Sequence, residues 1–211
     1  MIQKIFSNLG LSAIRVVGLP IVIRMWWGFF LNLPSIIRKR NLFPIDQYMS
    51  TINELKINGQ YGQFRVRPAA IDKMIVEEST TFSSIRELYI RNCYFKFHDF
   101  DPREIKTVLD LGANRGLAST MFTPFAEKIV SIEANPLFKE VIHFNVVETN
   151  GFKDHHIGCF FVDRHQSQDG LQPNTITIAE IISKYHLDQI DFLKIDIELS
   201  LIHISEPTRP Y

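Results

Sequence analysis

The ten residues 107–116 constrain the fold more than any other stretch of the chain. A short apolar run with β-forming residues is interrupted by Asp110 and then by Gly112 and Gly116. This pattern is typical of a buried parallel strand that turns tightly into a helix, because glycine permits a strained backbone and leaves room for a ligand. A plain strand-to-helix turn fits the same residues, since short glycine motifs are weak signals on their own.

Strand and helix patterns alternate on both sides of this turn. Asn135-Pro136 begins one predicted helix and Asn150-Gly151 ends it, while a capping box at residues 177–180 begins another. Such alternation predicts parallel, right-handed βαβ units, and therefore an α/β fold with a Rossmann-like, mostly parallel sheet. Further predicted strands are residues 128–133, 157–162 and 190–198, and residues 117–126 form the first crossover helix.

Residues 41–100 precede this sheet and are expected to cover one end of it. Alternating residues 63–67 predict a half-buried strand that ends at Pro68. Helical spacing indicates short helices around residues 71–76 and 83–92, and residues 94–97 suit another strand.

The first forty residues differ from the rest because two apolar runs contain clustered tryptophan and phenylalanine. Arg15 and Arg24 interrupt the apolar span, Pro20 lies within it, and the basic residues 38–40 follow it. Three interpretations remain open: a helix lying in a membrane interface, a single membrane crossing, and a helical cap packed on the soluble domain. We therefore expect a cytoplasmic protein, with peripheral membrane contact through residues 1–40 as one alternative.

Overall composition excludes some partners. Lys plus Arg and Asp plus Glu both number 23, so no charge excess indicates a nucleic-acid partner. Cys93 and Cys159 are too few and too far apart to indicate a disulfide framework, and neither belongs to a metal-ligand cluster. We expect no metal site and a reducing compartment.

Acids at the ends of the predicted strands form the first part of a candidate site. Glu133 ends the second strand 23 positions after Asp110, a separation that suits an acid accepting hydrogen bonds from a ribose. Between Gly112 and Gly116 stands Asn114, where a dinucleotide-binding turn has its middle glycine. An adenosyl ligand without phosphates therefore fits better than NAD, and Asp163 either contacts the adenine amino group or caps a turn.

The fourth predicted strand, residues 190–198, supplies the second part of the candidate site. Lys194, Asp196 and Glu198 alternate and so share one face, although their neighbours are apolar. Buried charges are costly unless paired, so the bland interpretation is an ion pair that closes the sheet end. In the functional interpretation Asp196 or Glu198 is a general base or a ligand-orienting carboxylate toward a hydroxyl, and Lys194 adjusts how readily it takes a proton. The pair His155-His156 is expected in a solvated turn.

These motifs together resemble the FkbM-type S-adenosylmethionine-dependent methyltransferases over residues 64–198. The resemblance implies a sheet of the class I methyltransferase type and O-methyl transfer to a hydroxyl of a sugar, glycolipid or secondary metabolite. The open alternatives are an NAD-linked oxidoreductase and a non-catalytic, membrane-tethered binding module. By resemblance, the cofactor turn is Asp110, Gly112, Asn114 and Gly116, the ribose acid is Glu133, and the family's Lys-x-Asp-x-Glu strand is Lys194, Asp196 and Glu198.

The resemblance ends after Glu198, where the family continues with glycine and another acid but this chain has Leu199. Residues 199–209 match, residue for residue, the translation of a transposase-based sequencing adaptor. We therefore expect residues 199–211 to be adaptor-derived and the sheet to be incomplete at that edge, which predicts a poorly stable and inactive fragment of an active parent enzyme. The expected organisation is an apolar extension (1–40), a cover (41–100), a partial methyltransferase domain (101–198) and this tail.

Overall fold

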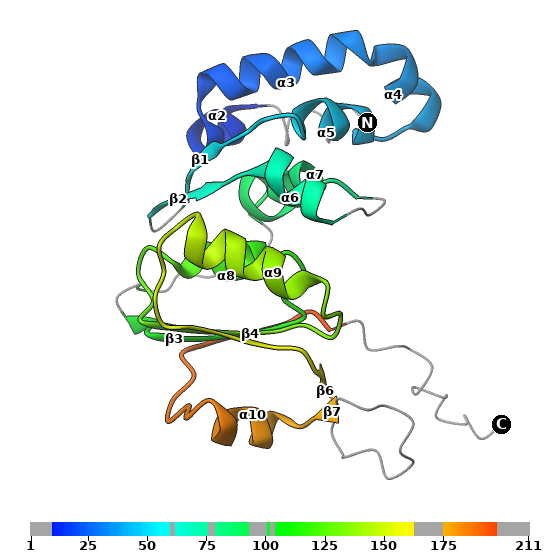
Figure 1. Ribbon diagram of the computed structural model, residues 1–211. Helices are drawn as coiled ribbons and strands as arrows, with labels where there is room; N and C mark the ends of the chain where they lie inside the picture. Colours follow the sequence, from blue (N-terminus) through cyan, green and yellow to red (C-terminus); the bar gives the residue numbers. More distant parts are fainter. Residues whose placement is uncertain are drawn as a thin grey trace, which may run out of the picture.

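The computed structural model describes residues 10–59, 62–75, 79–92, 101, 104–162 and 175–197. The elements are stacked in layers (Figure 1). N-terminal helices form one outer layer, a hairpin with short helices lies beneath them, and the central sheet lies between two further helical layers.

Four parallel strands form the central sheet. They are β3 (Thr107–Leu111), β4 (Lys128–Ile132), β5 (His155–Gly158) and β8 (Phe192–Ile195). Their spatial order is β5-β4-β3-β8, with Asp110 opposite both Ser131 and Lys194. The chain thus moves outward from β3 to β5 and then crosses back to the other side of β3. This confirms an α/β fold with a parallel sheet, compatible with a Rossmann-like arrangement, and ligands of such sheets bind beside the point of reversal.

Helices cover both faces of this sheet. The helices α8 (Leu117–Phe122) and α9 (Phe138–His143), with the π-helical turn η3 (Phe144–Glu148), cover one face. The helix α10 (Ile178–Lys184) covers the other and begins at the predicted capping box of Thr177 and Glu180. Strand residues alternate accordingly, with Val108 and Ile129 in the core under α8 and Leu109 and Val130 in the core over α10.

Several element boundaries differ from the sequence-based prediction, and of the fourth predicted strand, residues 190–198, only Phe192–Ile195 form β8. The helix α8 ends at Phe122 instead of residue 126, and a turn precedes β4, because Pro124 cannot continue a helix. The predicted strand 157–162 is two strands: β5 starts earlier, and β6 (Phe161–Val162) pairs with β7 (Thr175–Ile176) in a separate sheet. The apolar pattern did not reveal where β5 begins, because its first two residues are histidines.

The cover contains the predicted hairpin. Strand β1 (Leu55–Asn58) pairs antiparallel with β2 (Gln63–Val66), which confirms the strand before Pro68. Asn150 holds this hairpin against the domain, because its side chain bonds both backbone groups of Arg65, at 2.8 and 2.9 Å. The short helices are α6 (Pro68–Met74), α7 (Thr81–Ile85) and the π-helical turn η1 (Arg86–Ile90); the predicted strand at 94–97 lies outside the described residues.

The N-terminal segment forms four helices: α2 (Leu11–Val17), α3 (Leu19–Leu31), α4 (Leu33–Lys39) and α5 (Phe43–Met49). Gly18 separates α2 from α3, and Pro20 lies in the first turn of α3, where proline is tolerated. Inward side chains such as Met25 share one hydrophobic core with the hairpin and α8. No single described helix is long and apolar enough to cross a membrane; α3 and α4 together pass by length and composition but are bent by 73°.

Candidate functional site

A buried ion pair lies at the carboxyl ends of β3 and β8. The Lys194 Nζ lies 3.0 Å from Asp110 Oδ1, and the side chains are only 6% and 0% exposed. The same ammonium donates to the Gly112 carbonyl at 2.6 Å, while Asp110 Oδ2 accepts from the Ser119 hydroxyl at 2.6 Å. Asp110 is therefore closed off from solvent, and its role is to hold the turn and β8 together rather than to touch a ligand.

The glycine turn has the backbone conformation that the sequence predicted. Gly112, Asn114 and Gly116 all have positive φ, of 75°, 49° and 70°. A Cβ on Gly112 would lie 2.0 Å from the Asp196 carbonyl oxygen, and one on Gly116 would lie 3.1 Å from Ile142 Cα. Both glycines thus permit close approach of the protein's own backbones, a reason for glycine that needs no ligand.

Glu133 joins this turn to the loop after β4. Its Oε2 accepts from the Asn114 amide at 2.8 Å and its Oε1 from the Asn135 amide at 3.0 Å. The carboxylate is half-buried. The structure therefore brings the predicted ribose acid beside the predicted cofactor turn.

Asp196 follows directly after β8 and supplies an accessible carboxylate. Its Oδ2 lies 3.7 Å from Lys194 Nζ, and its side chain is 68% exposed. Its amide donates to the Leu111 carbonyl at 2.9 Å, which holds it at the end of the sheet. The predicted proximity of Lys194 and Asp196 is confirmed, whereas Glu198 and Asp163 lie outside the described residues.

Sequence reasoning missed a buried chain of polar side chains that crosses the sheet. From Asp110 and Ser119 it continues to the Ser131 hydroxyl, 2.8 Å from that of Ser119, and then to His155 Nε2 at 2.9 Å. The prediction of a solvated turn was wrong for His155, which lies on β5. Its neighbour His156 also lies on β5, not in a turn, but its side chain is 43% exposed and pairs with Asp154 at 2.9 Å. Neighbouring positions of three strands thus carry polar groups that hydrogen-bond one another, although His155 Nδ1 has no partner within the described part of the chain.

His155 should make the stability of the fold sensitive to acid. Burial, helped by the nearby His143 and His156, lowers the pKa of His155 from 6.5 to about 4. The unfolded chain therefore binds the extra proton more readily, so stability present above about pH 6.5 is lost as the pH falls toward 4, by at most about 3 kcal/mol. Urea unfolding across this range should show that slope, and His155→Gln should reduce it.

His156→Gln is the matched control, because its exposed ring should leave the slope unchanged. An unaltered slope in His155→Gln would contradict the assignment of acid sensitivity to His155.

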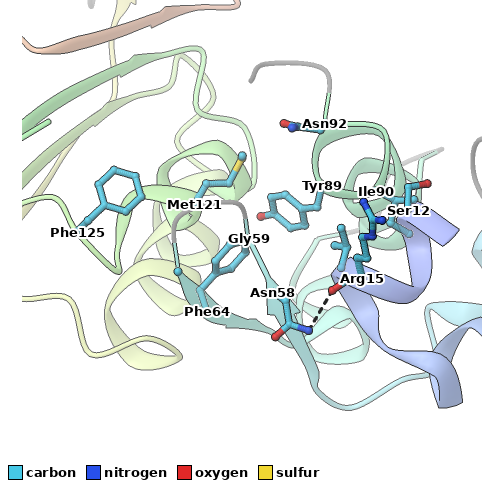
Figure 2. A pocket seen from close by; sticks show the side chains of 12 residues that line it. Ser12, Arg15, Asn58, Gly59, Phe64, Tyr89, Ile90, Asn92, Met121 and Phe125 are labelled. Atoms are coloured by element: carbon cyan, nitrogen blue, oxygen red, sulfur yellow. Dashed lines mark hydrogen bonds between the residues drawn. The ribbon is translucent and has the colours of Figure 1, made fainter. Parts of the chain in front are cut away.

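A second feature, a cavity of about 450 Å³, lies away from this edge of the sheet (Figure 2). Phe64, Tyr89 and Met121 supply apolar walls, with Arg15 and Asn58 among the polar lining residues. Met121 lies near the end of α8, whereas the glycine turn precedes its start. The cavity is therefore separate from the carboxyl ends of the strands.

Comparisons with protein-family models, curated proteins and solved structures found no match. The resemblance to FkbM-type methyltransferases stays a prediction that rests on the motifs and their arrangement. Among the described residues, no three His, Cys, Asp or Glu side chains form a group that could hold a metal ion.

Proposed function

We propose that this chain carries the cofactor-binding part of an S-adenosylmethionine-dependent O-methyltransferase that acts on a hydroxyl of a sugar, glycolipid or secondary metabolite. The observation that carries the proposal is the reversal of strand order between β3 and β8. Because parallel strands end at one edge, this reversal gathers the Gly112 turn, Glu133 and Asp196 at the place where such sheets bind ligands.

The chemistry of these residues suits an adenosyl ligand better than a dinucleotide. Glu133 and Asp196 offer carboxylate oxygens, which accept hydrogen bonds from ribose hydroxyls and from an ammonium group. The cations of the turn and of β8 are both buried and engaged: Arg115 Nη2 donates to the Ser79 carbonyl at 2.8 Å, and Lys194 to that of Gly112. A pyrophosphate would therefore meet carboxylates here rather than these two cations.

The roles of the residues follow from their exposure. Glu133 orients the ribose, while the buried Asp110 and Lys194 position the turn and Asp196. When bound, the cofactor would supply an electrophilic methyl group on its sulfonium sulfur. Asp196 Oδ2 would take the proton of the acceptor hydroxyl, and alignment of that oxygen would supply much of the rate.

Calorimetry of the full chain with S-adenosylmethionine and with NAD tests the proposal. We expect S-adenosylmethionine to bind, if weakly, in preference to NAD. Glu133→Gln should weaken this binding about tenfold, because hydrogen bonds to a charged group are worth about 1.5–3 kcal/mol.

The matched control is Glu140→Gln, on the exposed surface of α9, which should bind as the unaltered chain does. Circular dichroism of each variant would separate loss of binding from loss of the fold. Binding of NAD in preference to S-adenosylmethionine, or of neither, would overturn the proposal.

A further inference from the structure

The outward face of α3 is an exposed apolar stripe. Its opposite face, with Val22, Met25 and Gly28, is buried against the protein. In Figure 1, α3 forms the outermost layer, at the far end of the molecule from α10. The stripe consists of Leu19, Ile23, Trp27, Phe30 and Leu31, which are 54–61% exposed.

The spacing of these residues shows that the stripe is continuous. Positions 19, 23, 27, 30 and 31 recur every three or four residues, so they share one side of the helix. Soluble monomers rarely leave large apolar side chains together in water, and such a patch usually marks a contact with a protein or a membrane.

The charges of residues 1–45 indicate what kind of surface the stripe contacts. Residues 1–45 contain six Lys or Arg and no Asp or Glu, although the whole chain is neutral. The first acid, Asp46, is buried in an ion pair with Arg86. Three of the cations, Arg38, Lys39 and Arg40, are consecutive and exposed at the end of α4, which follows directly on α3.

We propose that α3 lies in the plane of an anionic phospholipid surface. The stripe enters the boundary between headgroups and acyl chains, where tryptophan is favoured, and the basic cluster 38–40 contacts anionic headgroups. This inference does not depend on the proposed methyltransferase activity.

Two other modes of contact fit the structure less well. A membrane crossing would surround α3 with lipid, but its inner face is packed on the protein, and its 13 residues span only about 20 Å of a hydrocarbon core of about 30 Å. A symmetric contact of the stripe with a second copy would offer the basic cluster no acidic partner from this segment, because residues 1–45 contain no Asp or Glu.

Sedimentation of the full chain with vesicles tests this orientation. We expect binding to vesicles of equal parts phosphatidylcholine and phosphatidylserine, and much weaker binding to phosphatidylcholine alone. Replacing Arg38, Lys39 and Arg40 by Gln should weaken binding to the anionic vesicles about fivefold for each charge removed. The double variant Trp27→Ser and Phe30→Ser should weaken binding to both vesicles at least tenfold.

Leu137→Ser is the matched control, because Leu137 is 72% exposed but lies far along the chain, next to α9. It should bind vesicles as the unaltered chain does. Equal binding to neutral and anionic vesicles would overturn the inference, as would resistance of the bound chain to alkaline extraction, which indicates a crossing. A dimer that dissociates in the Trp27→Ser and Phe30→Ser variant, without vesicle binding, would also overturn it.

Discussion

Replacing Lys194 with methionine should lower the free energy of unfolding by about 3–5 kcal/mol, measured by urea denaturation. Methionine keeps much of the aliphatic length of lysine but removes the ammonium group. Asp110 would then keep its bond from Ser119 but lose the ammonium group that lies 3.0 Å away within a solvent-free site. An uncompensated buried carboxylate accounts for the large cost.

Lys106→Met is the matched control for this variant. Its Nζ lies 2.6 Å from Glu127, a shorter contact, but the two side chains are 50% and 68% exposed. Solvent screening should keep the loss in this control below about 1 kcal/mol. Adding Asp110→Leu to Lys194→Met should restore part of the lost stability, because no buried charge then remains. A loss in Lys194→Met as small as that in the control would show that Asp110 does not depend on its partner.

The central sheet could be predicted from the sequence because its signals are local. The run 107–111, the capping box at Thr177 and the alternating run 63–67 each specify their own conformation within a few residues. Alternation of such elements then implies parallel pairing. The proximity of Asp110, Glu133 and Lys194 follows as well, since all three lie near the carboxyl ends of predicted parallel strands.

The buried polar chain could not be predicted, because it depends on how distant elements meet. Ser131 reaches His155 only because β4 and β5 pair with Ile129 opposite His155. No local pattern specifies that register, and two adjacent histidines are ordinarily polar surface residues. The glycine turn shows a similar limit. Its conformation is local, but the backbone that approaches Gly112 is that of Asp196, directly after β8.

The sequence could not predict which face of α3 is buried and which is exposed. Both are apolar, so the sequence indicates a hydrophobic helix but not which side packs on the protein. Contacts of α3 with α5, including the close fit of Gly28 against Tyr48, decide that question. Long-range packing therefore determines which apolar residues remain exposed.

Replacing Arg86 with alanine should lower the free energy of unfolding by about 3–5 kcal/mol at neutral pH. Arg86 Nε and Nη2 donate to the two oxygens of Asp46 at 2.9 and 2.8 Å, and the side chains are 13% and 2% exposed. Burial raises the pKa of Asp46, while the hydrogen bond and charge of Arg86 oppose that rise. Without Arg86 the pKa of Asp46 should rise further.

That pH dependence distinguishes a lost ion pair from lost packing. A carboxyl group whose pKa is raised by folding favours the folded state most in acid, and this contribution is lost as the pH rises through the folded pKa. The stability difference between Arg86→Ala and the unaltered chain should therefore be smallest in acid and grow toward neutral pH, in urea unfolding at roughly pH 4 and pH 7. Arg91→Ala is the control, because its pair with Glu87 at 3.1 Å is exposed and should cost less than about 1 kcal/mol. An equal loss of stability in Arg86→Ala at both pH values would show that Arg86 acts through packing. A loss of stability that grows toward neutral pH would show that the Arg86–Asp46 ion pair joins η1 to α5.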